Sequence, residues 1–491
     1  MNHTIKRSLY IIAAVASTVF VGCKKQLDIN HDPNNAPQET GTAALIYPSA
    51  MMSTTGRIGG ELNIVGGIWS EYYTQSYTSN QYKTLDAYNL QSTDYQNSYT
   101  ELFSGALNDY KFAIDTAKGA QDWNYYLMGT VMNAYTTATL VDLYDQIPYS
   151  EAFAGKANLN PKFDDGYTIY EDLLKRIDDA LSKDFSAKTN TDPGESDFIF
   201  QGDMDNWKKF ANTLKLKLYL RMINAKATEA ETKIKDLINS GAEFLDVDAA
   251  VKNFSSTPDK QNPFYAYNIY RLNTTTNLRA SKTFTSWLNA NNDPRIVSFF
   301  DSVTAVPMNQ GDFLGTYSKP TVFVQAATDP VQFISAAESY FLQAEASVRY
   351  FNSVGAKALY DQGVAEAFAA LGYGSSVSNP FVQAGGKYEF PAGGTIDNQI
   401  EAIIVQKWAH FAYGSHSLEA FFDRNRTGYP KSSPVYSTSP SYIPGQIVYT
   451  PNGVTGGKFP KRLLFPDVER SRNKNTPPEV PITTPVWWAK Q

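Results

Sequence analysis

Very few residues of this chain have the type and spacing that catalysis requires. The histidines beyond residue 22 are His31, His410 and His416, and the last two stand six positions apart, so they do not form the i,i+4 pair of a zinc-binding helix. The chain has neither a Gly-x-Ser-x-Gly nucleophile elbow nor a Gly-x-x-x-x-Gly-Lys phosphate loop. The residue inventory therefore predicts no catalytic site and no cofactor.

Two acidic patterns have the look of metal sites. Asp203 and Asp205 form an Asp-x-Asp, but they precede a predicted helix, 206–223, whose first N–H groups need acceptors, so we expect Asp205 to be its N-cap. The alternating acids and amides of Asp28–Asn34 lack the glycine and glutamate of a calcium loop, and Asx-turns ahead of Pro33 explain them better. We therefore predict no metal. A surface hydrolase, with two carboxylates facing across a cleft, stays open as an alternative.

The only cysteine, Cys23, lies behind the features of a bacterial export signal. A basic start with Lys6 and Arg7 is followed by an apolar run, 9–21, that is too short to span a bilayer. The four residues ending at Cys23, Phe-Val-Gly-Cys, resemble a lipobox, in which a peptidase cuts before the cysteine and its thiol receives acyl chains. An ordinary secretory signal with an accidental cysteine is the alternative. A lone thiol forms no internal disulfide, so lipidation of Cys23 is the better explanation.

This interpretation divides the chain into three parts. Residues 1–22 are predicted to be the signal peptide, 23–40 the lipid anchor and flexible tether, and 41–491 one α-helical domain whose C-terminal region is rich in loops. The chain has a net charge of −6, which makes nucleic acid an unsuitable partner. Without disulfides, the domain must be stabilised by its apolar core, and its length allows that.

Aromatic residues are 14% of the chain, and tyrosine is the commonest of them. Tyrosine combines a flat apolar face with a polar rim, which suits stacking on sugar rings or on peptide groups. Two stretches interleave aromatics with amide and hydroxyl residues, as a binding surface would. The ligand-binding candidates from these stretches are Trp69, Tyr72, Tyr73, Tyr77, Tyr82, Tyr265, Tyr267 and Arg271.

Apolar residues at steps of three and four predict most of the secondary structure. The predicted helices are 122–144, 167–181, 206–223, 281–290, 337–351, 355–371 and 398–413. The first of them is apolar on two faces, which indicates a helix sandwiched between neighbours. The composition of 321–325 predicts a short strand. No regular period is found from residue 429 to the end.

One predicted helix pair matches a known repeat. Ala344, Ala356, Tyr360 and Gly363 have the spacing at which the two helices of a tetratricopeptide repeat cross closely. We therefore expect a mostly α fold, in which a tetratricopeptide-like helix-pair scaffold carries long loop-rich insertions with the ligand face.

Several motifs together resemble one protein family. In chain order they are Asp28–Asn34, Asp142–Ala152, Phe200–Asp203, Trp207–Leu216 with Arg221, Ala337-Glu338, Gln343–Ala346, Gln406–Trp408, Glu419–Arg426, Pro460–Pro466, Glu469 and Asn473. This set is similar to the SusD/RagB family, in particular its SusD-like nutrient-binding outer-membrane lipoproteins. The resemblance covers nearly all of the chain after Cys23.

The resemblance implies a function. Family members are lipoproteins of the bacterial outer membrane that face the exterior, bind oligosaccharides or peptides, and deliver them to a SusC-like TonB-dependent transporter; they are not enzymes. Most of the shared residues are expected to be architectural, with Arg424 and Arg426 pairing with acids such as Asp423 or Glu419. Peptide capture, a surface hydrolase and a passive protein-assembly scaffold are the alternatives to glycan delivery.

Overall fold

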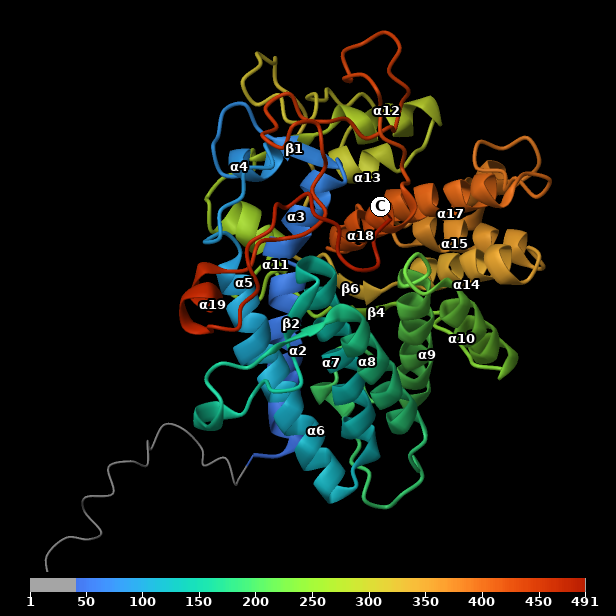
Figure 1. Cartoon of the computed structure of the whole chain (residues 1–491). Helices are drawn as coiled ribbons and strands as arrows, with labels where there is room; N and C mark the ends of the chain where they lie inside the picture. Colours follow the sequence, from blue (N-terminus) through green and yellow to red (C-terminus); the bar gives the residue numbers. More distant parts are fainter. Residues whose placement is uncertain (1–40, 491) are drawn as a thin grey trace, which may run out of the picture.

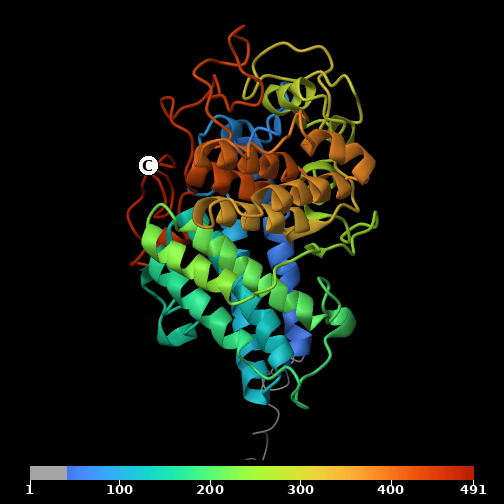
Figure 2. The same cartoon turned by 90° about the vertical axis from the view of Figure 1, so that its right-hand side faces the viewer.

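The computed structural model describes residues 41–490, and helices are the main regular structure among them, as predicted (Figure 1). A first run of helices fills the lower half of the molecule. It consists of α2 (Ala43–Ile58), α6 (Asn108–Ala120), α7 (Trp123–Tyr144), α8 (Gly166–Leu181), α9 (Met204–Arg221) and α10 (Ala227–Asn239). Each helix of the run packs against the next. Figure 2 shows them side by side beneath the later helices.

A second group of helices continues this packing upward from α9. It consists of α14 (Ala336–Tyr350), α15 (Ala356–Ala369), α16 (Ser375–Val382), α17 (Ile396–His410) and α18 (Ser417–Thr427). Helix α14 packs on α9, α15 and α17, and α18 packs on α3 (Glu61–Trp69), which brings the chain back to its N-terminal part.

The remaining elements are short and lie mainly among the loops. They are α4 (Lys83–Asp86), α5 (Gln96–Glu101), η2 (Leu102–Leu107), η3 (Gly155–Ala157), η4 (Gly194–Ser196), α11 (Pro263–Tyr265), η5 (Ala266–Tyr270), α12 (Lys282–Ala290), α13 (Ile296–Phe300) and α19 (Asp467–Arg472). Apart from α19, the chain beyond residue 429 consists of loops that wind over the upper half and the side of the molecule (Figure 1). The predicted lack of a regular period there is confirmed.

Strands are few, and two of the three pairs join segments that are distant in sequence. Three two-stranded antiparallel sheets pair β1 (Tyr73–Gln75) with β5 (Leu278–Ala280), β2 (Gln146–Pro148) with β3 (Phe163–Asp165), and β4 (Ala249–Val251) with β6 (Val331–Ile334). The strand predicted at 321–325 is wrong. That segment makes one isolated bridge, from Val322 to Arg279, and its next N–H groups bond to two different elements, so no ladder forms.

The predicted helices are present, and no predicted end differs from the observed one by more than three residues. Helix α7 is buried from Tyr125 to Tyr144, which confirms that it is sandwiched on both faces. One cap prediction is wrong. Asp203, and not Asp205, is the N-cap of α9, and it accepts bonds from the N–H groups of Asp205 and Asn206, both at 3.0 Å. The helices between residues 43 and 120 were not predicted, because their aromatic and polar residues hide the helical period.

The close crossing of α14 and α15 is confirmed. Ala344, Ala356 and Tyr360 are at most 1% exposed. A Cβ at Gly363 would stand 2.7 Å from the ring of Phe341, so only a hydrogen fits at this contact.

Residues of the family motifs, together with Lys217, form a buried ionic network between α9, α14, α17 and α18. Lys217 lies 3.0 Å from Glu338 and 2.9 Å from Glu419, and Arg426 lies 2.9 Å from Asp423. The predicted acid partner of Arg426 is therefore confirmed. Arg424 differs, because it donates to the hydroxyl of Ser432 at 2.9 Å and covers an aromatic ring, and no acid lies within ion-pair distance in the described chain.

The network shows how charge can be kept in a core. Burial opposes the ionisation of Glu345, but Arg426 and Arg349 outweigh it and lower the pKa of this carboxyl to about 2. Asp142 is the opposite case, since burial raises its pKa to about 6 although Arg221 lies 3.3 Å away. Removing one member of such a buried pair leaves an uncompensated charge, and so these residues are architectural.

Candidate functional site

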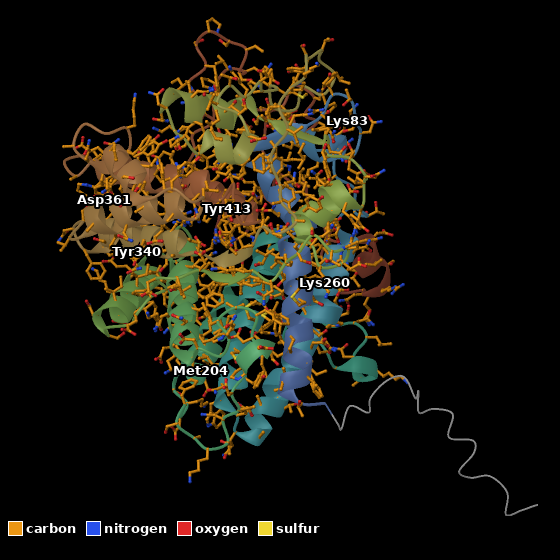
Figure 3. All side chains as sticks on the ribbon, turned by 180° about the vertical axis from the view of Figure 1, so that it is seen from behind. Lys83, Met204, Lys260, Tyr340, Asp361 and Tyr413 are labelled. Carbon is orange, nitrogen blue, oxygen red and sulfur yellow. The ribbon has the colours of Figure 1, made fainter. Side chains whose placement is uncertain are left out.

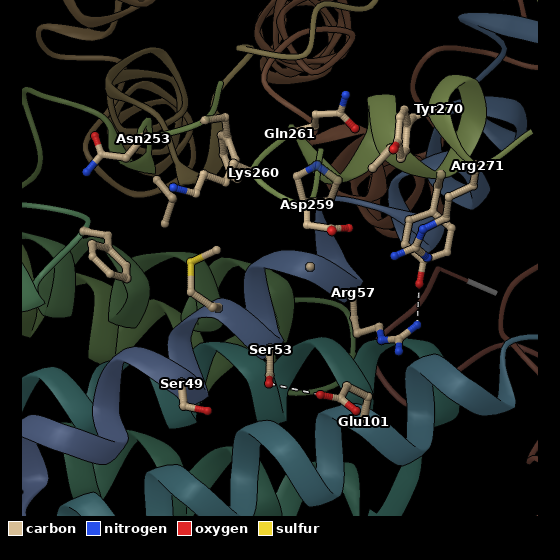
Figure 4. Close-up of a pocket in the computed structure, with 18 residues that line it drawn as sticks. Ser49, Ser53, Arg57, Glu101, Asn253, Asp259, Lys260, Gln261, Tyr270 and Arg271 are labelled. Carbon is tan, nitrogen blue, oxygen red and sulfur yellow. Dashed lines mark hydrogen bonds between the residues drawn. The ribbon is translucent and has the colours of Figure 1, made fainter. Parts of the chain in front are cut away.

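A cleft of about 670 Å³ lies between helix α2 and the segment 251–271 (Figure 4). Ser49, Ser53 and Arg57 on α2 are four residues apart, so they line one side of the helix and form the floor. Gly56 widens the cleft at this floor, because a Cβ there would meet no atom within 4 Å. The opposite wall comes from the segment that carries the second aromatic cluster.

Asn262 fixes this wall in place. It is 1% exposed, and its side-chain oxygen caps α11 by accepting the N–H of Tyr265 at 3.1 Å. Its amide nitrogen donates to the carbonyl of Asp329 at 2.9 Å and to the hydroxyl oxygen of Ser415 at 3.1 Å. An asparagine can pair with backbone groups of a helix end and of distant loops at the same time. The π-helix η5, which carries Tyr267 and Tyr270, follows α11 directly.

Tyr267 is the centre of one end of the cleft. Its hydroxyl oxygen accepts a hydrogen bond from Arg57, and the guanidinium of Arg271 lies 4.5 Å from the centre of its ring. The ring packs over Gly60, where a Cβ would stand 2.8 Å from it. Arg57 and Arg271 thus both contact one half-buried tyrosine, and Figure 4 shows the two arginines at the same end of the cleft.

The remaining lining supplies an exposed ring and polar groups. Tyr270 is 46% exposed and can offer its face to a ligand. Asn253 and Gln261 contribute amides. Lys260 and Asp259 contribute charges, and Figure 3 shows Lys260 beside α2 on the rear face of the molecule. Glu101 accepts the hydroxyl hydrogen of Ser53 at 3.1 Å. The combination of aromatic, amide and charged groups suits a polar ligand with flat faces.

Tyr267 and Arg271 are the two predicted ligand residues that line this cleft. Tyr265, in the same segment, is half-buried and does not line it. Tyr77 is half-buried in another loop, where its ring centre lies 5.9 Å from that of Tyr317. Of the predicted ligand residues, the cleft therefore contains only Tyr267 and Arg271.

The structure places the other four candidates in the core, away from the cleft. Trp69, Tyr72 and Tyr73 are at most 2% exposed, and Tyr82 is 9% exposed. The indole N–H of Trp69 donates to the carbonyl of Leu85 at 3.2 Å. The hydroxyl of Tyr72 donates to Trp408 at 2.5 Å, and that of Tyr73 donates to Asn63 at 3.2 Å. Because backbone carbonyls satisfy their polar tips, these side chains can be buried completely.

The residues that sequence reasoning missed are mainly on α2. Arg57, Ser53 and Gly56 belong to a helix that was not predicted, and a serine–serine–arginine spacing of four within it was the available signal. Lys260 and Asp259 come from a polar loop without a pattern. Their place in the cleft follows from tertiary structure alone.

The two histidines of the described chain are buried. His410 lies 2.7 Å from the hydroxyl of Ser335, and His416 lies 2.8 Å from Glu338. Burial lowers the pKa of His410 to about 4. Within residues 41–490, no group of three or more His, Cys, Asp or Glu side chains is placed to hold a metal ion.

Some predictions fall outside the described residues. Cys23, His31, the Asp28–Asn34 pattern and the signal peptide 1–22 belong to this part of the chain. Between residues 41 and 490, no helix has both the length and the apolarity needed to span a membrane.

The sequence comparison shows the family. The SusD-like family model described as "Starch-binding associating with outer membrane" matches residues 34–449. The chain belongs to this SusD-like family, as the motif resemblance predicts. No curated protein matches the chain significantly.

Solved structures share the fold over nearly the whole chain. A SusD homologue from Bacteroides uniformis has a TM-score of 0.74 at 22% identity, covering 91% of this chain and 99% of its own. A SusD/RagB family protein from Bacteroides thetaiotaomicron has a TM-score of 0.71 at 22% identity, with coverages of 91% and 99%. A chitin-binding SusD homologue from Flavobacterium johnsoniae has a TM-score of 0.68 at 20% identity, with coverages of 90% and 98%. The predicted fold class is thereby confirmed.

Proposed function

We propose that this protein binds an oligosaccharide at the outer membrane and delivers it to a partner SusC-like TonB-dependent transporter. The observation that carries the binding role is the cleft between α2 and the segment 251–271, with its exposed Tyr270 ring, its amides and the two arginines that contact Tyr267. Aromatic faces pack on the apolar faces of sugars, while amides and guanidinium groups match sugar hydroxyls. The family description, starch binding with outer-membrane association, agrees with this role.

The same cleft has features that suit a peptide, which is the second candidate. Asn253 and Gln261 lie along its wall, and side-chain amides can pair with both the N–H and the carbonyl of a peptide backbone. The proposed role is binding and delivery without turnover in both cases. The lipid at Cys23 would attach the protein to the membrane, with the body facing the exterior.

A cleft-filling substitution tests the binding site. Gly56→Phe places a ring in the open space over α2, and Gly119→Phe is its matched control, because a Cβ at Gly119 on α6 also meets no atom within 4 Å and Gly119 does not line the cleft. Oligosaccharides and peptides are titrated calorimetrically into native protein and both variants. We expect Gly56→Phe to weaken binding at least about tenfold and Gly119→Phe to bind as the native protein does.

Two results would contradict the proposal. Equal affinity of native protein and Gly56→Phe would place the ligand elsewhere, provided that both variants have the same unfolding temperature as the native protein. Release of cleaved products from a bound oligosaccharide or peptide would show that the protein is an enzyme.

A further inference from the structure

The charges in the cleft are not balanced. Arg57, Lys260 and Arg271 line it together with the acids Glu101 and Asp259, which gives 3 − 2 = +1 within a chain whose net charge is −6. No ion pair within 4 Å joins any of these three cations to a carboxylate of residues 41–490, although salt bridges occur throughout that part of the chain. The cations are therefore available to a ligand.

Two buried arginines elsewhere in the protein are paired with acids, unlike the arginines of the cleft. Arg426 is paired with Glu345 at 2.5 Å, and Arg295 is paired with Asp293 at 2.6 Å. Arg57 and Arg271, in contrast, are held by one tyrosine, through its hydroxyl and its ring face. A tyrosine orients a guanidinium without neutralising it, so most of the five N–H donors of each arginine keep their capacity for an anion.

The position of the groups adds a direction. Figure 4 shows Arg57 and Arg271 at one end of the cleft, Lys260 towards the other end, and Asp259 between them. Glu101 at the arginine end is already engaged as an acceptor by Ser53. A ligand that spans the cleft thus meets positive charge at the arginines and again at the exposed Lys260.

From this arrangement we infer that the oligosaccharide bound in the cleft is acidic, with carboxylate or sulfate groups that pair with Arg57 and Arg271. The planar fork of a guanidinium matches two oxygens of a carboxylate or a sulfate, and such charge-assisted bonds are stronger than those to neutral hydroxyls. The exposed face of Tyr270 would contact a sugar ring of the same ligand. This inference rests on the proposed glycan-binding function and names the class of glycan.

The test compares saccharides that differ only in charge. Tetragalacturonate and its carboxyl-reduced, neutral form are titrated into the purified protein, and a carrageenan tetrasaccharide that has sulfate but no carboxylate distinguishes the two anion sources. We expect the favoured anionic ligand to bind at least about tenfold more tightly than the neutral one. Its affinity should fall as salt is raised, because screening weakens charge pairs, while that of the neutral ligand stays constant.

Substitutions assign the effect to the arginines. Arg57→Gln and Arg271→Gln should each weaken the anionic ligand by about tenfold and the neutral ligand by a smaller factor, because the glutamine amide can still pair with a sugar hydroxyl. Unfolding temperatures equal to that of the native protein show that both variants remain folded. Lys175→Gln removes a positive charge from an exposed site on α8 that does not line the cleft, and we expect native affinities for both ligands.

The outcomes separate this inference from the proposed function. A neutral saccharide that binds as tightly as both anionic ones overturns the acidic preference and leaves glycan binding intact. Absence of binding by every saccharide overturns both. A tetraglutamate peptide that binds more tightly than any saccharide overturns the glycan assignment, since the anion would then belong to a peptide.

Discussion

The aromatic side chains of the core and those of the cleft differ in the hydrogen-bond partners of their polar groups. Trp69, Tyr72 and Tyr73 have aromatic faces of the kind that bind ligands, but backbone carbonyls satisfy their polar tips and their rings are buried. Tyr267 uses its hydroxyl differently, as the acceptor for an arginine at the edge of an open space. The partner of the polar tip, more than the residue type, decides which aromatic is available to a ligand.

Glu71 is a single buried acid that should make stability depend on pH. It is 0% exposed, and it accepts hydrogen bonds from the hydroxyl of Thr283 and from the N–H of Val448 at 3.0 Å. Burial raises the pKa of its carboxyl to about 8. Between the unfolded value of 4.5 and about 8, the folded protein binds more protons than the unfolded chain, so this group makes the free energy of unfolding fall as pH rises.

Glu71→Gln removes this dependence, because the amide keeps an acceptor oxygen and cannot ionise. We expect the variant to gain stability relative to the native protein steadily from pH 5 to pH 8, as measured by urea unfolding at several pH values. Glu195→Gln, at an exposed acid, is the control and should follow the native curve. Parallel curves for native protein and Glu71→Gln would contradict the assignment.

At the scale of elements, helix pairs cross where small residues permit it. The contact of α14 and α15 depends on Gly363, whose hydrogen faces Phe341. Because Phe341 is 0% exposed, its ring has no free space into which it can move.

Gly363→Ala should therefore destabilise the protein by about 1–3 kcal/mol through overpacking. Gly119→Ala on α6 is the matched control, since its Cβ meets no atom within 4 Å, and helix propensity alone predicts a gain of about 0.5–1 kcal/mol. Urea unfolding of both variants measures the two effects. Equal stability of Gly363→Ala and the native protein would show that the crossing is looser than described.

Elements also show what sequence can predict. Helix α7 was predictable because apolar residues recur on both of its faces, and burial from Tyr125 to Tyr144 is the reason for that pattern. The strand at 321–325 was not, because composition favours an extended chain but cannot say whether a partner is aligned with it. In the candidate cleft, Tyr267 and Arg271 were predictable from the local density of aromatic residues. Arg57 was missed because it lies on the unpredicted helix α2, 210 residues before Tyr267 in the chain, and only the tertiary structure brings the two residues together.

At the scale of the whole molecule, the cleft lies where the helical scaffold meets the loops. Helix α2 belongs to the packed helices on one side, and the π-helix η5 lines the opposite side of the cleft. The buried ionic network stabilises the scaffold separately, with none of its charged groups in the cleft. The ligand surface can therefore change without disturbing the family's shared architecture.

The proposed lipid anchor at Cys23 would attach the whole protein to the membrane. We expect Cys23→Ala, expressed without the transporter in a bacterial host that processes lipoproteins, to move the protein from the membrane pellet to the soluble fraction, because the variant cannot receive the acyl chains that would attach it. Native protein should remain in the pellet and should co-purify in detergent with a large barrel protein. Continued membrane attachment of Cys23→Ala would refute lipidation at this residue.

The most direct test of the central claim is a crystal structure of the protein with an oligosaccharide that binds it in solution. We predict an intact saccharide between α2 and the segment 251–271, with a sugar ring on Tyr270 and polar groups at Arg57 and Arg271. A saccharide bound outside this cleft, for example in the groove lined by Phe103 and Phe153, would contradict the account.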